Sequence, residues 1–184
     1  MGFKVGDYAV YPLHGVGVVE DVAIKEIGGM RQKMFVLRIL ENNMTVMVPV
    51  ATASNVGLRE VMNREKVREV YEVLSSPPKK SENQTWNRRY RDYLARIKTG
   101  DTSEVGLVLR DLAGVRANKN LSFGERKMFD TAWSLLVREI ALARDLTVEE
   151  IGEDFEAIFA GKGDEIMARM DKAKRKRSKK SRKK

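Results

Sequence analysis

The spacing of apolar residues along this 184-residue chain changes once, near residue 62, and that change limits the folds open to it. Before this point, short runs of β-branched and aromatic residues alternate with turn residues, and Gly28-Gly29 and Asn42-Asn43 allow the left-handed backbone of tight hairpins. With no helical stretch between them, these runs predict a small antiparallel β-barrel of Tudor-like or SH3-like shape. The strands are expected at Val5–Tyr11, Val16–Ile27, Gln32–Leu40, Met44–Val50 and Val56–Met62.

After residue 62 the apolar residues recur every three to four positions, which is the period of a helix with one buried face. A first stripe ends before Ser75–Ser81, where two consecutive prolines predict a linker. Further stripes start at Trp86 and Val105, and capping-box sequences at Ser122 and Thr147 predict the starts of two more helices. The expected α+β chain has an N-terminal domain over residues 1–62, a helix and linker over 63–81, an all-helical bundle domain over 82–161 and an extension over 162–184.

The positive charge of the chain is concentrated at its C-terminal end. The formal net charge is +9, but residues 172–184 contain ten Lys or Arg and no acidic residue, which leaves residues 1–171 at −1. Within that body, residues 75–99 hold seven basic and two acidic side chains, a local charge of +5. We expect the tail to be disordered when free and to suit a polyanion such as nucleic acid. A solubilising extension or, in a eukaryote, a localisation signal is the alternative.

The sequence is poor in residues that carry out catalysis or bind metals. It has no cysteine, which excludes disulfides and thiolate metal sites and is typical of a reducing cytoplasm, and it has a single histidine, His14. Gly15-Val16-Gly17 precedes a strand and not a helix, so it does not match a dinucleotide-binding turn. No apolar run approaches the roughly 18 to 20 residues of a membrane span. We therefore predict a cytoplasmic protein that is not an enzyme, with no catalytic residue, no metal site and no cofactor.

One predicted strand has two different faces. Its core face should hold Met44, Val46, Val48 and Val50. Met47 and Pro49 belong to the other face. Because Pro49 has no N–H to donate, we expect this strand at or near a sheet edge, where Met47 and unpaired backbone groups are open to a partner strand. A second buried face, covered by a loop, fits the same pattern.

The densest combination of aromatic and basic residues is Thr85–Arg91, just after the predicted linker. On a helix Arg88 and Arg91 share a face, while Arg89 points elsewhere. Long cations of this kind bind phosphates, and the ring of Trp86 can stack on an exposed base or enter a groove. The alternative is that Trp86 begins the buried stripe of its helix and that the arginines form an ordinary solvated face.

Motifs in both halves of the chain make it similar to the CarD family of bacterial transcription regulators, in particular to the short members of that family. The matching segments are Phe3–Pro12 with His14-Gly15, Val46–Pro49, Thr85–Tyr90 and Leu121–Met128. They occur in the same order as in the family, and the resemblance covers about residues 2–160. The basic tail lies outside it.

The resemblance implies a different partner for each domain. The N-terminal Tudor-like domain would dock on the β subunit of RNA polymerase, and the helical domain would meet promoter DNA on the minor-groove side at the upstream edge of the transcription bubble. The family's wedge tryptophan matches Trp86. The candidate DNA-binding residues are therefore Trp86, Arg88, Arg89, Arg91, Arg126 and Lys127. The candidate polymerase-binding residues are Lys25, Met47 and Pro49, and Met47 departs from the Arg of some relatives.

The resemblance also implies a mechanism without turnover. A ring inserted at the upstream fork fills space that the re-pairing bases would reoccupy, and stacking of this kind contributes about 1 to 3 kcal/mol. Docking on the polymerase supplies a high effective concentration, so the DNA contact itself can be weak. We expect a monomer that works in the cytoplasm in association with the nucleoid. The competing hypotheses are a chromatin-like or RNA-associated binder driven by the basic tail, and an enzyme with an unrecognised site.

Overall fold

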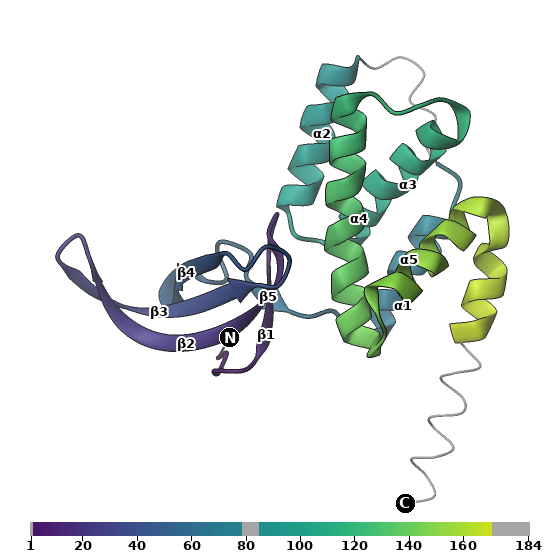
Figure 1. Cartoon of the computed structure of the whole chain (residues 1–184). Coiled ribbons are helices and arrows are strands. Elements are labelled where there is room, and N and C mark those ends of the chain that lie inside the picture. The colour runs from purple at the N-terminus through teal and green to yellow at the C-terminus, as the bar shows by residue number, and fades with distance from the viewer. Residues whose placement is uncertain (1, 79–84, 171–184) are drawn as a thin grey trace, which may run out of the picture.

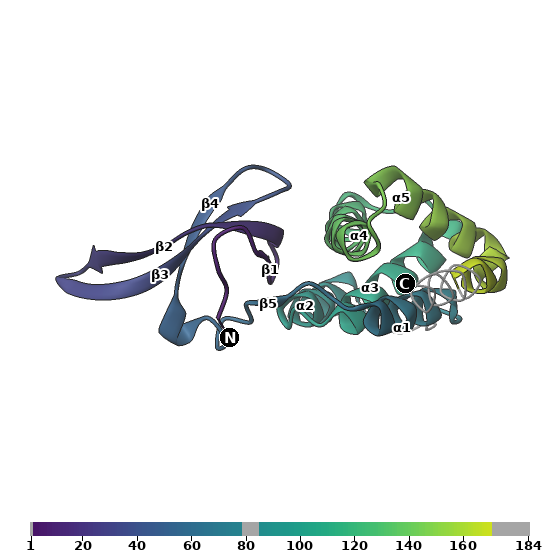
Figure 2. The same cartoon turned by 90° about the horizontal axis from the view of Figure 1, so that it is seen from below.

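The computed structural model describes residues 2–78 and 85–170. The strands are β1 Tyr8–Tyr11, β2 Gly15–Ile27, β3 Met30–Ile39, β4 Thr45–Pro49 and β5 Arg59–Glu60. The helices are α1 Arg64–Ser75, α2 Trp86–Lys98, α3 Thr102–Asn118, α4 Phe123–Arg144 and α5 Val148–Ala157. The sheet and the group of helices lie side by side and are joined between β5 and α1 (Figures 1 and 2). This α+β architecture is the one that the change of period predicts.

The five strands form one antiparallel sheet in the order β4-β3-β2-β1-β5. Its two edges, β4 and β5, are not hydrogen-bonded to each other, so the sheet is open and the expected closed barrel is not formed. The expected last strand, Val56–Met62, is too short to close a barrel, because only Arg59 and Glu60 pair with β1 and Gly57 breaks the extended backbone with a φ of 79°. At the other end of the sheet, β2 and β3 continue as a long hairpin that points away from the helices (Figures 1 and 2).

The strand β4 lies at a sheet edge, as Pro49 predicts. Val48 is buried, and Val46 and Val50 pack against the same hydrophobic cluster, which includes Phe3, Val19, Phe35 and Leu37. On the opposite face Met47 is 52% exposed, so the face is open there, whereas Met34 of β3, which pairs with Pro49 on the same face, is only 2% exposed. The prediction that Met44 lies on the core face is wrong. Met44 precedes the strand and is 37% exposed, because it still belongs to the turn in which the side chain of Asn42 accepts its backbone N–H.

The helices share one hydrophobic core. The helix α1, expected between the two domains, packs against α3 within this core, and its Tyr71 is fully buried. Both predicted capping boxes are present, at Ser122 before α4 and at Thr147 before α5. Residues 79–84, which include the last three residues of the predicted linker, lie outside the described residues.

The chain beyond α5 remains helical. Ile158–Lys162 kinks at Gly161, whose φ is 86°, and residues 163–170 form a further helical segment. Ile166 of this segment is buried in the helical core, so the predicted extension over 162–184 begins with packed structure. The basic tail, residues 172–184, lies outside the described residues. Within the described ranges no helix is both long and apolar enough to span a membrane.

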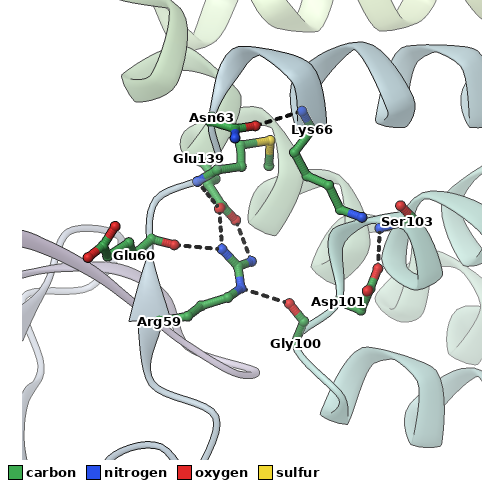
Figure 3. Close-up of polar contacts among 9 residues, drawn as sticks. Arg59, Glu60, Asn63, Lys66, Gly100, Asp101, Ser103 and Glu139 are labelled. Atoms are coloured by element: carbon green, nitrogen blue, oxygen red, sulfur yellow. Dashed lines mark hydrogen bonds and ion pairs between the residues drawn. The ribbon is translucent and has the colours of Figure 1, made fainter. Parts of the chain in front are cut away.

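An ion pair with a buried carboxylate joins the sheet to the helices (Figure 3). Arg59 of β5 holds Glu139 of α4 through two hydrogen bonds, from Nη1 to Oε1 at 2.5 Å and from Nη2 to Oε2 at 2.9 Å. The Nε of Arg59 also donates to the carbonyl oxygen of Gly100, in the turn between α2 and α3, at 3.0 Å. Glu139 accepts in addition the backbone N–H of Met62, just before α1, at 2.9 Å. One charge pair therefore connects β5, α1, α4 and the α2–α3 turn.

The turn between β1 and β2 also contacts the helical unit. Its Pro12 fits between Gly57 and Gly100: a Cβ at either glycine would lie 2.8 or 2.9 Å from the Cγ of Pro12, and both glycines have positive φ. A second turn of the sheet, between β3 and β4, contacts α4: the hydroxyl of Ser134 in α4 donates to Glu41 of this turn at 2.5 Å. These contacts give the sheet a defined orientation against the helices.

Candidate nucleic-acid interface

The first turns of α2 and α4 lie side by side at one end of the helical unit (Figure 1). Trp86 is the first residue of α2, and its indole packs over Gly124 at the start of α4. A Cβ at Gly124 would lie 2.8 Å from Cζ2 of the indole, closer than ordinary contacts allow. The glycine therefore forms the notch in which the tryptophan ring sits.

A buried ion pair beside the notch ties the two helices together. The Nη2 of Arg89 in α2 donates to Oε1 of Glu125 in α4 at 3.0 Å, and these side chains are only 13% and 3% exposed. Glu125 also completes the capping box of α4 by accepting the backbone N–H of Ser122 at 2.9 Å. The guanidinium of Arg89 lies 5.6 Å from the centroid of the Trp86 ring. Arg89 therefore holds the ring and the helix start in place.

The surroundings of Glu125 favour its ionised form. Burial alone would raise its pKa. Hydrogen bonds with the backbone and side chain of Ser122 and with Arg89, together with the charge of Lys119, outweigh burial and lower the pKa below the ordinary value of 4.5. The pair with Arg89 is thus a pair of full charges at neutral pH.

Trp86 is partly buried. The sequence allowed two interpretations, a core residue or a ring open to nucleic acid, and each describes part of its surface. The ring packs against the helical core, and its centroid lies 5.6 Å from that of Tyr90 one turn later. The residue as a whole is only partly buried, so part of it remains open to solvent. The structure therefore presents an anchored tryptophan, held by the fold yet accessible.

Four exposed cations lie on the same two helices. They are Arg88 and Arg91 of α2, and Arg126 and Lys127 of α4. Within residues 2–78 and 85–170, none of them forms an ion pair with a carboxylate; the Nε of Arg91 donates only to the carbonyl oxygen of Asn87, at 3.4 Å. We call Trp86 and these four cations the aromatic end of the helical unit.

The sequence reasoning missed Phe123, the first residue of α4. It is 86% exposed, the largest value for any large hydrophobic residue in the described parts of the chain. A signal for this was present in the sequence, because Phe123 does not share the helical phase of Met128, Phe129 and Ala132, which form the buried stripe of α4.

The residues expected to face the polymerase lie on the sheet, apart from the aromatic end. Met47 and Pro49 are on β4, which pairs with β3, and Lys25 of β2 pairs with Gln32 of β3. Because paired residues and residues two apart point to the same side, this register puts Lys25, Met47 and Pro49 on one face. Lys25 is close to the tip of the hairpin that points away from the helices (Figures 1 and 2).

The only histidine of the sequence, His14, lies in the turn between β1 and β2. The ring of His14 stacks on Tyr11, with centroids 5.2 Å apart. In the part of the chain that the structure describes, no three His, Cys, Asp or Glu side chains gather where they could hold a metal ion.

Comparison with known proteins assigns a family to both units. Residues 3–62 match the CarD-like/TRCF RID domain, and residues 69–156 match the family described as CarD, C-terminal domain. The "Putative transcription factor YdeB" of Bacillus subtilis (strain 168) is 31% identical over 149 residues, which are 81% of this chain and 97% of that protein. A solved structure, "CdnLNt from Myxoccoccus xanthus", is 50% identical and covers 34% of this chain and 87% of its own, with a TM-score of 0.29. Because both units match and a relative aligns over nearly its whole length, the chain belongs to the CarD-like family of transcription factors.

Proposed function

We propose that this protein binds the β subunit of RNA polymerase through its sheet and contacts promoter DNA at the upstream edge of the transcription bubble through its aromatic end. It thereby stabilises the open complex at transcription initiation. The observation that carries the proposal is the anchored Trp86 among four exposed cations, which is a combination suited to a base or groove beside phosphates. No turnover and no cofactor are involved, and the protein acts as a monomer in the cytoplasm, at the nucleoid.

The support for Trp86 as a wedge is its fixed position. The notch at Gly124 and the guanidinium of Arg89 hold the ring before any DNA arrives, so little conformational entropy is lost on binding. A ring stacked at the fork contributes about 1 to 3 kcal/mol. This energy shifts the balance between closed and open complexes by roughly five- to 150-fold.

The exposed cations supply the phosphate contacts in this proposal. Arg88, Arg91, Arg126 and Lys127 extend from two helices that meet at Trp86, and each contact with a phosphate releases a counterion from the DNA. Such contacts orient the protein without reading sequence. In this proposal Arg89, which pairs with Glu125 and is only 13% exposed, serves mainly to position Trp86.

The support for the polymerase contact comes from the N-terminal unit. Its edge strand β4 has unpaired backbone groups along one side and an exposed Met47, and such an edge accepts a partner's strand. Lys25 lies on the same face of the sheet and adds a positive charge near the hairpin tip. Since the ion pair of Arg59 and Glu139 holds the sheet against the helices, docking the sheet also places the aromatic end.

The proposal is tested by the lifetime of open complexes formed with the RNA polymerase of the same bacterium. The full chain should lengthen the lifetime, and Trp86→Ala should remove most of this effect, whereas Trp86→Phe should keep part of it. Lys98→Ala, at the far end of α2, is the matched control and should behave as the unmodified protein. A lifetime that Trp86→Ala leaves unchanged at saturating protein contradicts the proposal.

The same assay separates this proposal from a nucleic-acid binder driven by the basic tail. A chain that ends at residue 171 lacks all ten basic residues of the tail but keeps the aromatic end. We expect it to retain the lifetime effect that depends on Trp86. If truncation abolishes the effect while polymerase binding persists, the tail is the main DNA-binding element.

A further inference from the structure

The exposed ring of Phe123 has no structural role in the described part of the chain. It lies outside the hydrophobic core and is 86% exposed, whereas the next most exposed large hydrophobic residue, Met30, is 64% exposed. An isolated helix start does not require such a ring, because the capping box of α4 is formed by Ser122 and Glu125. A phenylalanine this exposed gains free energy when a partner covers it.

The position of Phe123 is fixed relative to Trp86. Gly124, the next residue, is the one against which the indole packs, and Glu125, one position further, is buried and bound to both Ser122 and Arg89. Phe123 therefore lies between a fixed cap and a fixed notch. The two aromatic side chains belong to one rigid surface formed by α2 and α4.

On the other side, Phe123 borders a groove of about 430 Å³ between α4 and the sheet. Arg126, Lys127 and one carboxylate, Asp130, line it from α4, and Leu13 and Glu41 line it from the turns of the sheet. Glu41 is engaged with the hydroxyl of Ser134, whereas neither Arg126 nor Lys127 forms an ion pair within the described ranges. The groove thus combines an exposed ring with cations that are open to a phosphate.

We infer that Phe123 is a second DNA-contacting ring, which stacks on an unpaired base of the promoter strand that passes from Trp86 into this groove. The inference rests on the proposed function and adds a residue to it. A base with its phosphate fits the site, because the base can stack on the ring and the neighbouring cations can bind the phosphate. Proteins that bind single-stranded nucleic acid combine aromatic rings and cations in this way. Specificity for one base is not expected, since every base has a π face.

The test uses the full chain, the polymerase and a promoter with 2-aminopurine at the first unpaired position of the upstream fork. Phe123→Ala should shorten the open-complex lifetime by about fivefold or more and should raise the 2-aminopurine fluorescence that stacking quenches. Phe123→Tyr keeps the ring and should behave as the unmodified protein. The midpoint of urea unfolding should be unchanged in both variants, because the side chain is exposed.

Val148 provides a matched control. It is also the first residue of a helix with a capping box, α5, and is exposed, but it lies away from the aromatic end. Val148→Ala should leave lifetime and fluorescence unchanged.

If Trp86→Ala shortens the lifetime and Phe123→Ala does not, the inference fails while the proposed function stands. If Phe123→Ala weakens polymerase binding without promoter DNA, the ring contacts protein and the inference is overturned. If the unmodified protein does not lengthen the lifetime, the proposed function itself fails.

Discussion

Among single residues, Glu125 has the largest number of roles at the aromatic end. Its carboxylate accepts the N–H of Ser122, pairs with Arg89 and is almost fully buried. Through Arg89 it is also coupled to the position of Trp86. A charge in this position stabilises the fold only while it is ionised and paired, so its stabilising effect depends on pH.

The lowered pKa of Glu125 predicts the sign of that dependence. In the unfolded chain the carboxyl titrates near the ordinary value of 4.5, and in the folded protein it titrates lower. Its contribution to the free energy of unfolding is therefore fully present above about pH 4.5 and is lost as the pH falls through the lower folded value. We expect urea unfolding to show that the unmodified protein loses stability below pH 4.5 more steeply than Glu125→Gln. Parallel pH profiles for the two proteins would contradict this assignment.

Sequence reasoning found some of these residues and missed others for a physical reason. Trp86 and its neighbouring arginines could be predicted because they form one local motif, and the capping box of Ser122 and Glu125 because its spacing is fixed. Arg89 and Glu125 are 36 positions apart, and from the sequence alone each would be expected to be an exposed charged side chain on the surface of a helix. Only the packing of α2 against α4 shows that both are buried.

Among the elements, the first turn of α4 determines the shape of the aromatic end. It provides the notch at Gly124 and the exposed ring of Phe123. The helix α5 offers a natural comparison, because its Gly152 also faces a tryptophan, Trp133. There, however, a Cβ would lie 3.5 Å from the indole, at ordinary contact distance.

This difference predicts opposite effects of the same substitution. Gly124→Ala should displace Trp86 and destabilise the protein by about 1 to 3 kcal/mol, since the added methyl overpacks the contact. It should also shorten the open-complex lifetime. Gly152→Ala should stabilise the protein by about 0.4 to 1 kcal/mol, because alanine restricts the unfolded chain, and should leave the lifetime unchanged. Urea unfolding and lifetime assays check both, and equal effects of the two substitutions would show that the notch has no special role.

Local patterns predicted the types of β1 to β5 and of α1 to α5 but not the helical segment at residues 163–170, and pairing between distant segments determined the form of the sheet. The edge position of β4 follows from Pro49 and is confirmed. The closed barrel was expected because five strands occur in succession, but closure needs a long last strand. Gly57 leaves only Arg59 and Glu60 to pair with β1.

In the whole molecule, the ion pair of Arg59 and Glu139 connects the surface proposed for the polymerase to the surface proposed for DNA (Figure 3). Its two residues are 80 positions apart, and neither belongs to a motif, so the sequence did not predict it. The two-unit organisation was predictable from the change of period. How the units are held together was not.

Breaking this pair should loosen the molecule at the junction. Arg59→Ala leaves the buried carboxylate of Glu139 without its cation and should destabilise the protein by about 3 to 5 kcal/mol. Arg38→Ala, which removes an exposed pair with Glu20 within the sheet, is the control and should cost less than about 1 kcal/mol.

The orientation of the two units can be measured with spin labels. The chain has no cysteine, so the labels can be attached to the single cysteines introduced by Glu26→Cys and Glu153→Cys. Arg59→Ala should broaden the distance between them; an unchanged distribution and an unchanged urea midpoint would contradict the role of the pair.

In the proposed function the aromatic end meets the upstream edge of the bubble while the sheet is bound to the polymerase. Photo-cross-linking from position 87 tests it most directly, because Asn87 is exposed and adjacent to Trp86, and a p-benzoylphenylalanine there leaves the tryptophan in place. In open complexes we expect cross-links to promoter nucleotides at the upstream edge of the bubble, and none from the same residue placed at Lys98, at the far end of α2. Cross-links to downstream DNA, or equal DNA cross-linking from both positions, would show that the aromatic end does not lie at the upstream edge of the bubble.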